Sequence, residues 1–505
     1  MESFIVPLRD LVTVAPAIIL LVWSTAILIG LVFVQSGRLH RAAPFYFALI
    51  GLVLAGVAYF QLAGIFASLP HPEGVHYTFN QMYSLDGLTL FFQGVFLAAG
   101  FLTVLISQRF LDEENATSPE YYALVLLSVA GMMLLAGAAD LITLYICLEF
   151  MAISVYILVG YLKAQSRATE ASLKYFILGA FSSALILFGM SLVFALTGTT
   201  NLESIHGALK SVGDGGQPLL VLALILFLAG LGFKIAAVPF HMWCPDAYEG
   251  APTPITAFIS VAPKAAGFAI FIRLFMFLFQ PLTAEYISLV GLLSIVTMTI
   301  GNLLAVRQTN VKRLLAYSSI SHAGFLLMGL MVREFIGLQA IGVYLVGYLF
   351  MNLGAFAVIT FMRRERIGGE DIEDFSGLIH AHPVVAAAMA VFLLSLAGIP
   401  PTVGFIAKYW VFGAVIKAYV ATMDRLFLYV AVAGALNAVV ALFYYFRIVK
   451  RMFMGDAVTR PPLALGLPAR IALGLTLAGT LILGLYPDPA IRFAGWIHMT
   501  FIGFY

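Results

Sequence analysis

Long apolar runs dominate the chain and recur between short polar or glycine-containing breaks. About fourteen of them reach the roughly 20 residues that an α-helix needs to cross the hydrocarbon core of a bilayer. They fall near residues 12–34, 44–66, 86–108, 120–139, 141–161, 171–197, 217–240, 254–280, 284–306, 312–331, 335–362, 383–418, 426–449 and 468–486. The pattern predicts an all-α polytopic membrane protein of about 14 transmembrane helices, with a stretch near 489–505 that suits the membrane interface.

Composition agrees with this pattern and excludes other classes of protein. Of the 505 residues, 62% are hydrophobic and only 10% are charged, whereas a soluble domain has about 25% charged residues. The net charge of +2 gives no reason to expect nucleic acid as a partner. Cys147 and Cys244 lack neighbours at metal-ligand spacing, so neither a disulfide framework nor a zinc site is predicted. The first run is longer than the apolar part of a signal peptide and is interpreted as the first span.

Lysine and arginine are distributed unevenly between the loops. The odd-numbered loops contain Arg38, Arg41, Arg109, Lys163, Arg167, Arg307, Lys312, Arg313, Arg363, Arg364, Arg366, Lys450, Arg451, Arg460 and Arg470. The even-numbered loops contain only Lys210, Arg333, Lys417 and Arg425. Because cytoplasmic loops are enriched in these residues, the odd loops are predicted to be cytoplasmic and both termini periplasmic.

Two spans are interrupted by proline. Pro239 breaks the seventh run, and Pro400 with Pro401 breaks the twelfth; each proline removes a backbone donor and clashes with the preceding turn. The breaks lie five helices apart, which predicts two inverted five-helix repeats, helices 4–8 and helices 9–13, with broken helices 7 and 12. The chain then divides into an N-terminal three-helix segment, two repeats, and a C-terminal helix and tail, at residues 1–110, 111–281, 282–450 and 451–505.

Glu149 is the sharpest chemical signal, because it lies near the middle of the fifth span. A carboxylate at that depth costs several kcal/mol unless it is protonated, paired or hydrated. Lys234, beside the break in the seventh span, is its natural partner, and a lysine can release and recapture a proton where an arginine cannot. A purely structural pair between two helices, or a Lys234 that extends to the interface, remains an alternative.

Five further residues are candidates for proton transfer. Lys264 lies near the middle of the eighth span and Lys408 lies seven residues beyond the second break, so both are predicted to be deep. Lys174 begins the sixth span, where extension to the interface is an equally good explanation. His322 has a pKa range suited to relay work, although it also fits a hydrogen-bonded core residue. His241 shares a face with Lys234 only if the helix resumes quickly after the break.

Three segments of this sequence carry a family resemblance. The segment GLGFKIAAVPFHMWCPDAYEGAPTPITAFISVAPKAAGFA spans Gly230–Ala269, VKRLLAYSSISHAG spans Val311–Gly324, and LAGIPPTVGFIAKYW spans Leu396–Trp410. The chain resembles, over essentially its whole length, the antiporter-like membrane subunit N of bacterial NADH:quinone oxidoreductase (respiratory complex I; homologue of mitochondrial subunit 2). The form HMWCPDAYEGAPTP and the chain length favour subunit N over the related subunits L and M, and Lys408 also argues against M, which has a glutamate there.

The resemblance assigns family positions to residues of this sequence. The family's helix-five glutamate matches Glu149, and its lysines in helices six, seven, eight and twelve match Lys174, Lys234, Lys264 and Lys408, with His241 as the neighbouring histidine. It implies a non-redox subunit of a proton-translocating NADH:quinone oxidoreductase in the bacterial plasma (inner) membrane. It also implies partner membrane subunits, such as sibling M and small membrane subunits, in contact with lipid. FMN, iron–sulfur clusters and a quinone belong, on this view, to other subunits.

The expected mechanism follows from both arguments. Quinone reduction elsewhere in the complex changes the field at Glu149 and Lys234, and a proton then passes to Lys264 and Lys408. The runner-up is a subunit of a multisubunit sodium/proton antiporter, which needs no electron transfer. A third interpretation is a structural subunit in which neutralising the charges affects assembly alone.

Overall fold

The computed structural model describes residues 7–30, 38–68, 75–210, 213–363, 369–456 and 465–500. Its helices and strands are α1 (Leu8–Thr13), α2 (Ala15–Gly30), α3 (Arg38–Ser68), β1 (His76–Thr78), β2 (Tyr83–Leu85), α4 (Gly87–Glu113), α5 (Pro119–Ala136), α6 (Leu141–Val159), α7 (Ser166–Thr197), α8 (Leu202–Leu209), η1 (Asp214–Gly216), α9 (Gln217–Ile235), α10 (Trp243–Gly250), α11 (Thr253–Phe277), η2 (Gln280–Leu282), α12 (Thr283–Val306), α13 (Val311–Met331), α14 (Phe335–Met362), η3 (Ile372–Phe375), α15 (Leu378–Ala381), α16 (Pro383–Ala397), α17 (Val403–Thr422), α18 (Arg425–Met454), α19 (Leu467–Leu485) and α20 (Asp488–Met499).

The helix count agrees with the sequence pattern. In the described part of the chain, 13 helices are long and apolar enough to cross a membrane, and α2 and α16 are shorter apolar helices. The pairs α9/α10 and α16/α17 each form one interrupted span, so the 13 long helices plus α2 give 14 spans. The predicted all-α polytopic fold with broken helices 7 and 12 is confirmed.

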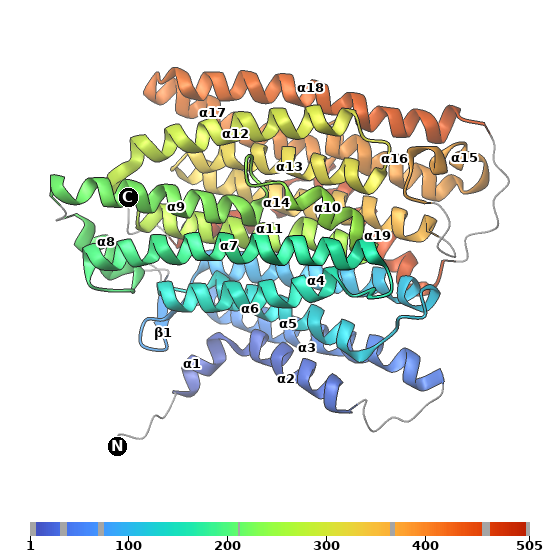
Figure 1. The fold of residues 1–505 in the computed structure, drawn as a ribbon, viewed down its shortest axis with the longest axis horizontal. Helices are drawn as coiled ribbons and strands as arrows, with labels where there is room; N and C mark the ends of the chain where they lie inside the picture. Colours follow the sequence, from blue (N-terminus) through green and yellow to red (C-terminus); the bar gives the residue numbers. More distant parts are fainter. Residues whose placement is uncertain are drawn as a thin grey trace.

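The spans lie side by side, from α2 and α3 at one edge to α17 and α18 at the opposite edge (Figure 1). Three of them, α11, α13 and α14, are almost wholly buried, whereas α3, α7, α18 and α19 present broad outward faces of exposed apolar side chains. Lys264 and Arg273 of α11 and Lys312 of α13 are therefore buried inside the protein. The short α20 packs beside α14, where Gln339 Nε2 donates to the carbonyl oxygen of Ile491 at 3.2 Å.

Odd and even loops gather at opposite ends of the bundle. At one end, Tyr83 bridges to Ala138 and Asp140 bridges to Asn201, which joins loops two, four and six; the hairpin of β1 and β2, not anticipated from the sequence, lies there with α8 (Figure 1). Residues of loops five, seven, nine and eleven line a single cavity at the other end. The basic residues Arg364, Arg366 and Arg460 lie outside the described residues.

Backbone pairing relates the two halves of the chain. Asp140 caps α6 and bridges to Asn201, and Asn310 caps α13 and bridges to Asp371 at the opposite end of the bundle. Each bridge joins residues 61 apart (201 − 140 and 371 − 310). The backbone hydrogen bonds flanking the bridges also correspond: Leu141 to Thr200 and Leu202 to Ala139 in one half, Val311 to Glu370 and Ile372 to Thr309 in the other. These features support inverted repeats of α5–α11 and α12–α18; the domain boundaries proposed from the sequence stay a prediction.

Candidate functional site

Glu149 of α6 and Lys234 of α9 form the predicted pair. Glu149 Oε1 lies 3.8 Å from Lys234 Nζ, and their side chains are 25% and 5% exposed. Ser183 of α7 lies between them: its hydroxyl donates to the Glu149 carboxylate, and its oxygen is 3.4 Å from Lys234 Nζ. Tyr156 of α6 accepts a further long contact from Lys234 at 3.5 Å. The ammonium is thus held weakly, by several partners at the edge of hydrogen-bonding distance.

The position of Lys234 follows from the end of α9. Ala236 adopts a left-handed conformation, φ 59°, which terminates the helix and leaves Lys234 in its last turn, where the negative end of the helix dipole favours a cation. The freed backbone is satisfied by neighbours, since Trp243 Nε1 donates to the Phe233 carbonyl at 2.9 Å and the Val238 amide donates to Thr297 at 3.1 Å. The break is therefore a defined structure inside the protein.

His241 lies inside this break. The helix resumes only at Trp243, as α10, so His241 occupies the turn between the two half-helices and does not continue the helical face of Lys234. The side chain is buried, and its Nδ1 has no hydrogen-bond partner within the described ranges. His241 was expected to share a face with Lys234 only if the helix resumed quickly after the break, and the helix does not resume before Trp243.

Lys264 is buried in α11, with its Nζ 2.5 Å from Ser319 Oγ of α13 and 5.6 Å from the centre of the Tyr248 ring. No carboxylate of the described chain lies within ion-pair distance of it. Gly267, one turn further along α11, brings this helix against α9: a Cβ at Gly267 would lie 2.7 Å from Ile235 Cγ2 and 3.7 Å from Lys234 Cβ. Lys234 and Lys264 therefore lie on either side of one close helix contact.

His322 connects Lys264 with Lys408 along α13. Ser319, His322 and Phe325 are spaced by three residues, which places them on one side of the helix. His322 Nδ1 shares a hydrogen bond of 2.6 Å with the Tyr344 hydroxyl, and Nε2 one of 3.2 Å with the Tyr445 hydroxyl. Ser319 holds Lys264 at one end of this row, and Lys408 Nζ lies 5.1 Å from the Phe325 ring at the other.

Lys408 reaches back across the second break. From α17 its Nζ donates to the carbonyls of Leu396 and Ala397, the last residues of α16, at 3.1 and 2.7 Å. Gly398 makes this possible, since it has φ 90° and a Cβ there would lie 2.8 Å from Lys408 Cδ. Both broken helices thus place a lysine at the carbonyl end of their first half, although the two lysines come from opposite sides of the break.

Lys174 lies apart from this row of residues. Its side chain is 46% exposed and pairs with Glu170 at 2.8 Å and Asp246 at 3.0 Å. Asp246 also binds Arg313, whose second partner is Glu249. Lys174 therefore belongs to a surface charge cluster where α7, α10 and α13 meet. The apolar run marked in the sequence begins near residue 171, but α7 begins at Ser166, so Lys174 lies in the polar first turns of the helix and not at the edge of the membrane.

Sequence reasoning missed two groups of buried polar residues. Uncharged polar side chains are buried along α11, the helix of Lys264, and along α14, and their spacing of three or four residues was the available signal: they are Thr253, Thr256, Ser260, Tyr344, Tyr348 and Asn352. Arg273 and Asp86 form a buried ion pair of 3.0 Å. Arg273 stands out in the sequence as a charged residue in the eighth apolar run, but its partner Asp86 lies 187 residues away.

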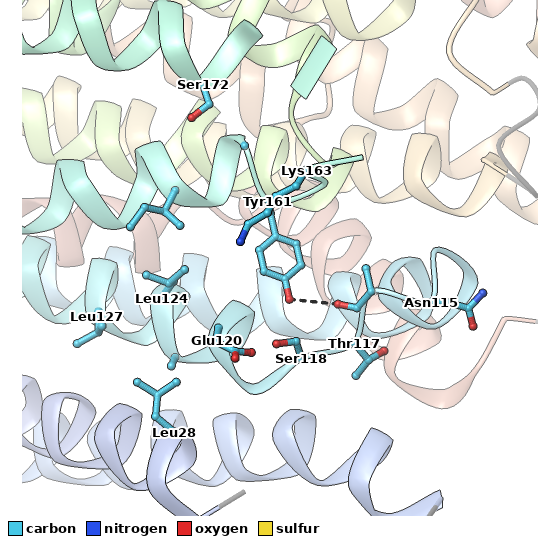
Figure 2. Close-up of a pocket in the computed structure, with 14 residues that line it drawn as sticks. Leu28, Asn115, Thr117, Ser118, Glu120, Leu124, Leu127, Tyr161, Lys163 and Ser172 are labelled. Carbon is cyan, nitrogen blue, oxygen red and sulfur yellow. Dashed lines mark hydrogen bonds between the residues drawn. The ribbon is translucent and has the colours of Figure 1, made fainter. Parts of the chain in front are cut away.

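A separate cavity of about 770 Å³ lies between α2, α5 and the ends of α6 and α7 (Figure 2). Leu28, Leu124 and Leu127 line one part, and Tyr161, which donates to the Ala116 carbonyl at 3.2 Å, lines another. The buried lysines do not line it. In the part of the chain that the structure describes, no group of three or more His, Cys, Asp or Glu is arranged to hold a metal ion.

Comparisons with known proteins agree with the resemblance noted in the sequence. Residues 138–434 match the family model described as "NADH:quinone oxidoreductase/Mrp antiporter, TM". The chain is 42% identical over 486 residues to NADH-quinone oxidoreductase subunit N 2 of Solibacter usitatus, covering 96% of this chain and 97% of that one. It is 40% identical to subunit N of Trichlorobacter lovleyi, with 96% of each chain covered.

Solved structures share the fold. A chain of respiratory complex I from Thermus thermophilus with bound aureothin has 32% identity and a TM-score of 0.76, covering 94% of this chain and 98% of its own. A chain of the Mrp complex from Dietzia sp. has 22% identity and a TM-score of 0.81, covering 98% of each, which shows the same fold alone. The predicted membership is confirmed: the chain belongs to the family of NADH-quinone oxidoreductase subunit N, the antiporter-like membrane subunits of respiratory complex I.

Proposed function

We propose that this chain translocates protons through Glu149, Lys234, Lys264, His322 and Lys408, as a membrane-arm subunit of NADH:quinone oxidoreductase. One observation carries the proposal: four lysines are buried in the described spans, and two of them, Lys264 and Lys408, have only neutral partners. A lysine in such surroundings can exist without its proton, whereas an arginine keeps its charge.

The pair of Glu149 and Lys234 is the point at which a change of electric field from the rest of the complex acts on the proton-transfer residues. Moving one proton against 100 mV requires about 2.3 kcal/mol. Two opposite charges at about 4 Å attract by about 4 kcal/mol at an effective dielectric constant of about 20. Loosening this pair therefore changes the energy of the Lys234 proton by enough to drive a transfer, and Ser183 and Tyr156 provide hydroxyls through which the pairing changes.

The transfer then follows the contacts of the central helices. Lys234 gives up its proton across the α9–α11 contact toward Lys264, and Ser319 and His322 carry it along α13 to Lys408. Successive positive charges repel one another, so protonation of one lysine disfavours protonation of the next. In this scheme His241 lies in the turn between α9 and α10, beside Lys234. Lys174 stays in the surface charge cluster and influences the transfer only through its charge.

The rest of the assembly supplies the redox chemistry. Quinone reduction, FMN and iron–sulfur clusters belong to other subunits, and sibling M and small membrane subunits contact the exposed apolar faces. The end of the bundle that gathers the odd loops faces the cytoplasm, since it holds most of the loop lysines and arginines. Both termini are then periplasmic, and the complex lies in the bacterial plasma membrane.

Lys264→Ala in the intact complex tests the route. In inverted membrane vesicles, the protons pumped per electron fall while NADH oxidation by the assembled complex persists. Lys417→Ala is the matched control, because Lys417 lies on α17 but its side chain is 62% exposed beside Glu334. Unchanged pumping in Lys264→Ala would show that the route is wrong, and loss of assembly alone would favour a structural subunit.

A further inference from the structure

The cavity between α2, α5, α6 and α7 lies at the end of the bundle that gathers the odd loops (Figure 2). Its volume of about 770 Å³ falls within the range of about 300–1,000 Å³ that is typical of sites for small organic molecules. None of the residues proposed to transfer protons lines it. The cavity can therefore hold a molecule that takes no part in the proton route.

The lining of this cavity changes from polar to apolar with depth along the bundle. Residues 115–118 form the loop before α5, and Lys163 belongs to the loop after α6. Leu124 and Leu127 lie in the second and third turns of α5, and Leu28 lies in the last turn of α2. At 1.5 Å per residue, Leu127 is about 12 Å deeper than the start of α5. A polar mouth above an apolar wall matches the order of headgroup and acyl chain in a phospholipid.

Lys163 and Glu120 bring opposite charges to the polar end of the cavity. Both residues are exposed, and neither has an ion-pair partner within the described ranges. By contrast Arg109 and Glu113, at the same end of the bundle, are paired at 2.7 Å. Figure 2 shows the two side chains around the Tyr161 ring. A zwitterionic headgroup satisfies both charges, because its phosphate accepts from the Lys163 ammonium and its own ammonium donates to the Glu120 carboxylate.

The apolar part of the cavity is open to the outward face of the bundle. Leu28 and Ile157 line it, and they are 38% and 49% exposed. Tyr161, whose hydroxyl donates to the Ala116 carbonyl at 3.2 Å, belongs to the polar end, and tyrosine is enriched where a membrane protein meets the headgroups. Apolar cavities do not retain ordered water. An acyl chain from the surrounding bilayer is therefore the molecule that fills this space.

We propose that this cavity is a binding site for one glycerophospholipid with a primary ammonium in its headgroup, as in phosphatidylethanolamine. The phosphate contacts Lys163 and the headgroup ammonium contacts Glu120. One acyl chain lies against Leu28, Leu124 and Leu127. The inference does not depend on the route by which protons cross the chain.

The bound lipid packs against a functional part of α6. Ile157 follows Tyr156, whose hydroxyl lies 3.5 Å from Lys234 Nζ. Ser172 of α7, which also lines the cavity, donates to the Tyr156 carbonyl at 2.8 Å. The lipid thus completes the packing around the turn of α6 that presents Tyr156 to the buried lysine.

The test uses the intact complex in phosphatidylcholine vesicles that contain a small fraction of a photoreactive phospholipid. The probe has a diazirine in one acyl chain and either an ethanolamine or a choline headgroup, and choline has no N–H to donate to Glu120. After illumination, mass spectrometry counts the adducts on peptides that contain Leu28, Leu124 or Ile157. Lys163→Gln and Glu120→Gln each remove one charge, and Leu28→Trp fills the apolar part of the cavity.

Two substitutions in α18 are the matched controls, Lys450→Gln and Leu442→Trp. Lys450 is an exposed lysine near the end of α18, and Leu442 is 38% exposed, as Leu28 is. Neither residue lines the cavity. NADH oxidation by each variant shows that the complex is assembled, and Lys163→Gln carries the test if Leu28→Trp fails to assemble.

In the unaltered complex, the ethanolamine probe is expected to label the cavity peptides about fivefold more than the choline probe, the factor that one exposed charge pair provides. Leu28→Trp should remove most of the labelling, Lys163→Gln should lower it for both probes, and Glu120→Gln should remove most of the preference for ethanolamine. Equal labelling by the two probes, or labelling that neither Leu28→Trp nor Lys163→Gln lowers, would overturn the proposal. An unlabelled cavity in the unaltered complex would mean that a neighbouring subunit covers it, and this result would overturn the proposal as well.

Discussion

Helix α11 carries two buried cations, Lys264 and Arg273, and their surroundings are opposite in kind. All five N–H donors of Arg273 are used: they reach both carboxylate oxygens of Asp86, the hydroxyls of Ser84 and Thr89, and the Ala136 carbonyl. Lys264, nine residues earlier, has one serine hydroxyl and an aromatic ring. The charge of Arg273 is fixed and fully compensated by its partners, whereas the charge of Lys264 is barely compensated.

The difference separates a charge that holds the fold from a charge that moves. A guanidinium with a carboxylate and a complete set of hydrogen bonds has no alternative arrangement of equal energy, and it cannot lose its proton. An ammonium with neutral partners can lose its proton without leaving a carboxylate unpaired. Removing each charge should therefore have opposite effects on stability and on transport.

Arg273→Met has the largest expected effect on stability. It leaves the fully buried Asp86 without its cation, and breaking a buried pair in this way costs about 3–5 kcal/mol. The assembled complex should melt at a lower temperature or lose this subunit during purification. Lys264→Met, the same substitution on the same helix, should leave melting nearly unchanged and reduce pumping. The contrast fails if the two variants melt alike.

Gly398→Ala tests the space around a second mobile charge, Lys408. The left-handed conformation costs a residue with a Cβ about 1–2 kcal/mol, and the new Cβ would lie 2.8 Å from Lys408 Cδ. We expect lower thermal stability together with reduced pumping, because the ammonium is displaced from its two carbonyls. Gly474→Ala in α19 is the control, since nothing lies within 4 Å of a Cβ there. Equal effects of the two changes would contradict this role for Gly398.

Ala236→Gly places a glycine at the left-handed residue of the first break, where the second break has Gly398. Ala236 already has φ 59°, so glycine removes the steric cost of a left-handed residue but adds backbone entropy to the unfolded chain. The net gain in stability is expected to be below about 1 kcal/mol, as a small rise in melting temperature with Lys234 still in place. A fall in melting temperature would mean that the Ala236 methyl contributes more through packing than it costs.

The sequence revealed the charges that break an apolar run and did not reveal what holds them. Glu149, Lys234, Lys264 and Lys408 stand out because charge is expensive at those depths. Thr253, Ser260 and Asn352 add little to hydropathy, so only their helical spacing marks them. Lys174 was drawn into the candidate set because the apolar run begins later than α7 itself. The fourteen spans were predictable because run length fixes a membrane helix, whereas contacts between distant helices had no local signature.

The smallest predicted effect concerns Glu370, at the rim of the cavity that residues of loops five, seven, nine and eleven line. Its partial burial raises its pKa, but the cations of Lys312 and Arg363 lower it by more, so the pKa lies below its ordinary 4.5. A carboxylate with a depressed folded pKa stabilises the folded state above its unfolded pKa, and the contribution disappears as the pH falls through the lower, folded value. Glu370→Gln should therefore cost below about 1 kcal/mol at neutral pH and flatten the loss of stability below about pH 4.5.

Melting curves of the assembled complex at several pH values measure this, with Glu334→Gln, beside the exposed Lys417, as the control. If Glu370→Gln left the acid limb of the melting curve unchanged, the Glu370 carboxylate would contribute nothing to stability, and Lys312 would resemble Lys264 and Lys408, held by the neutral carbonyls of Glu249 and Ala251 alone.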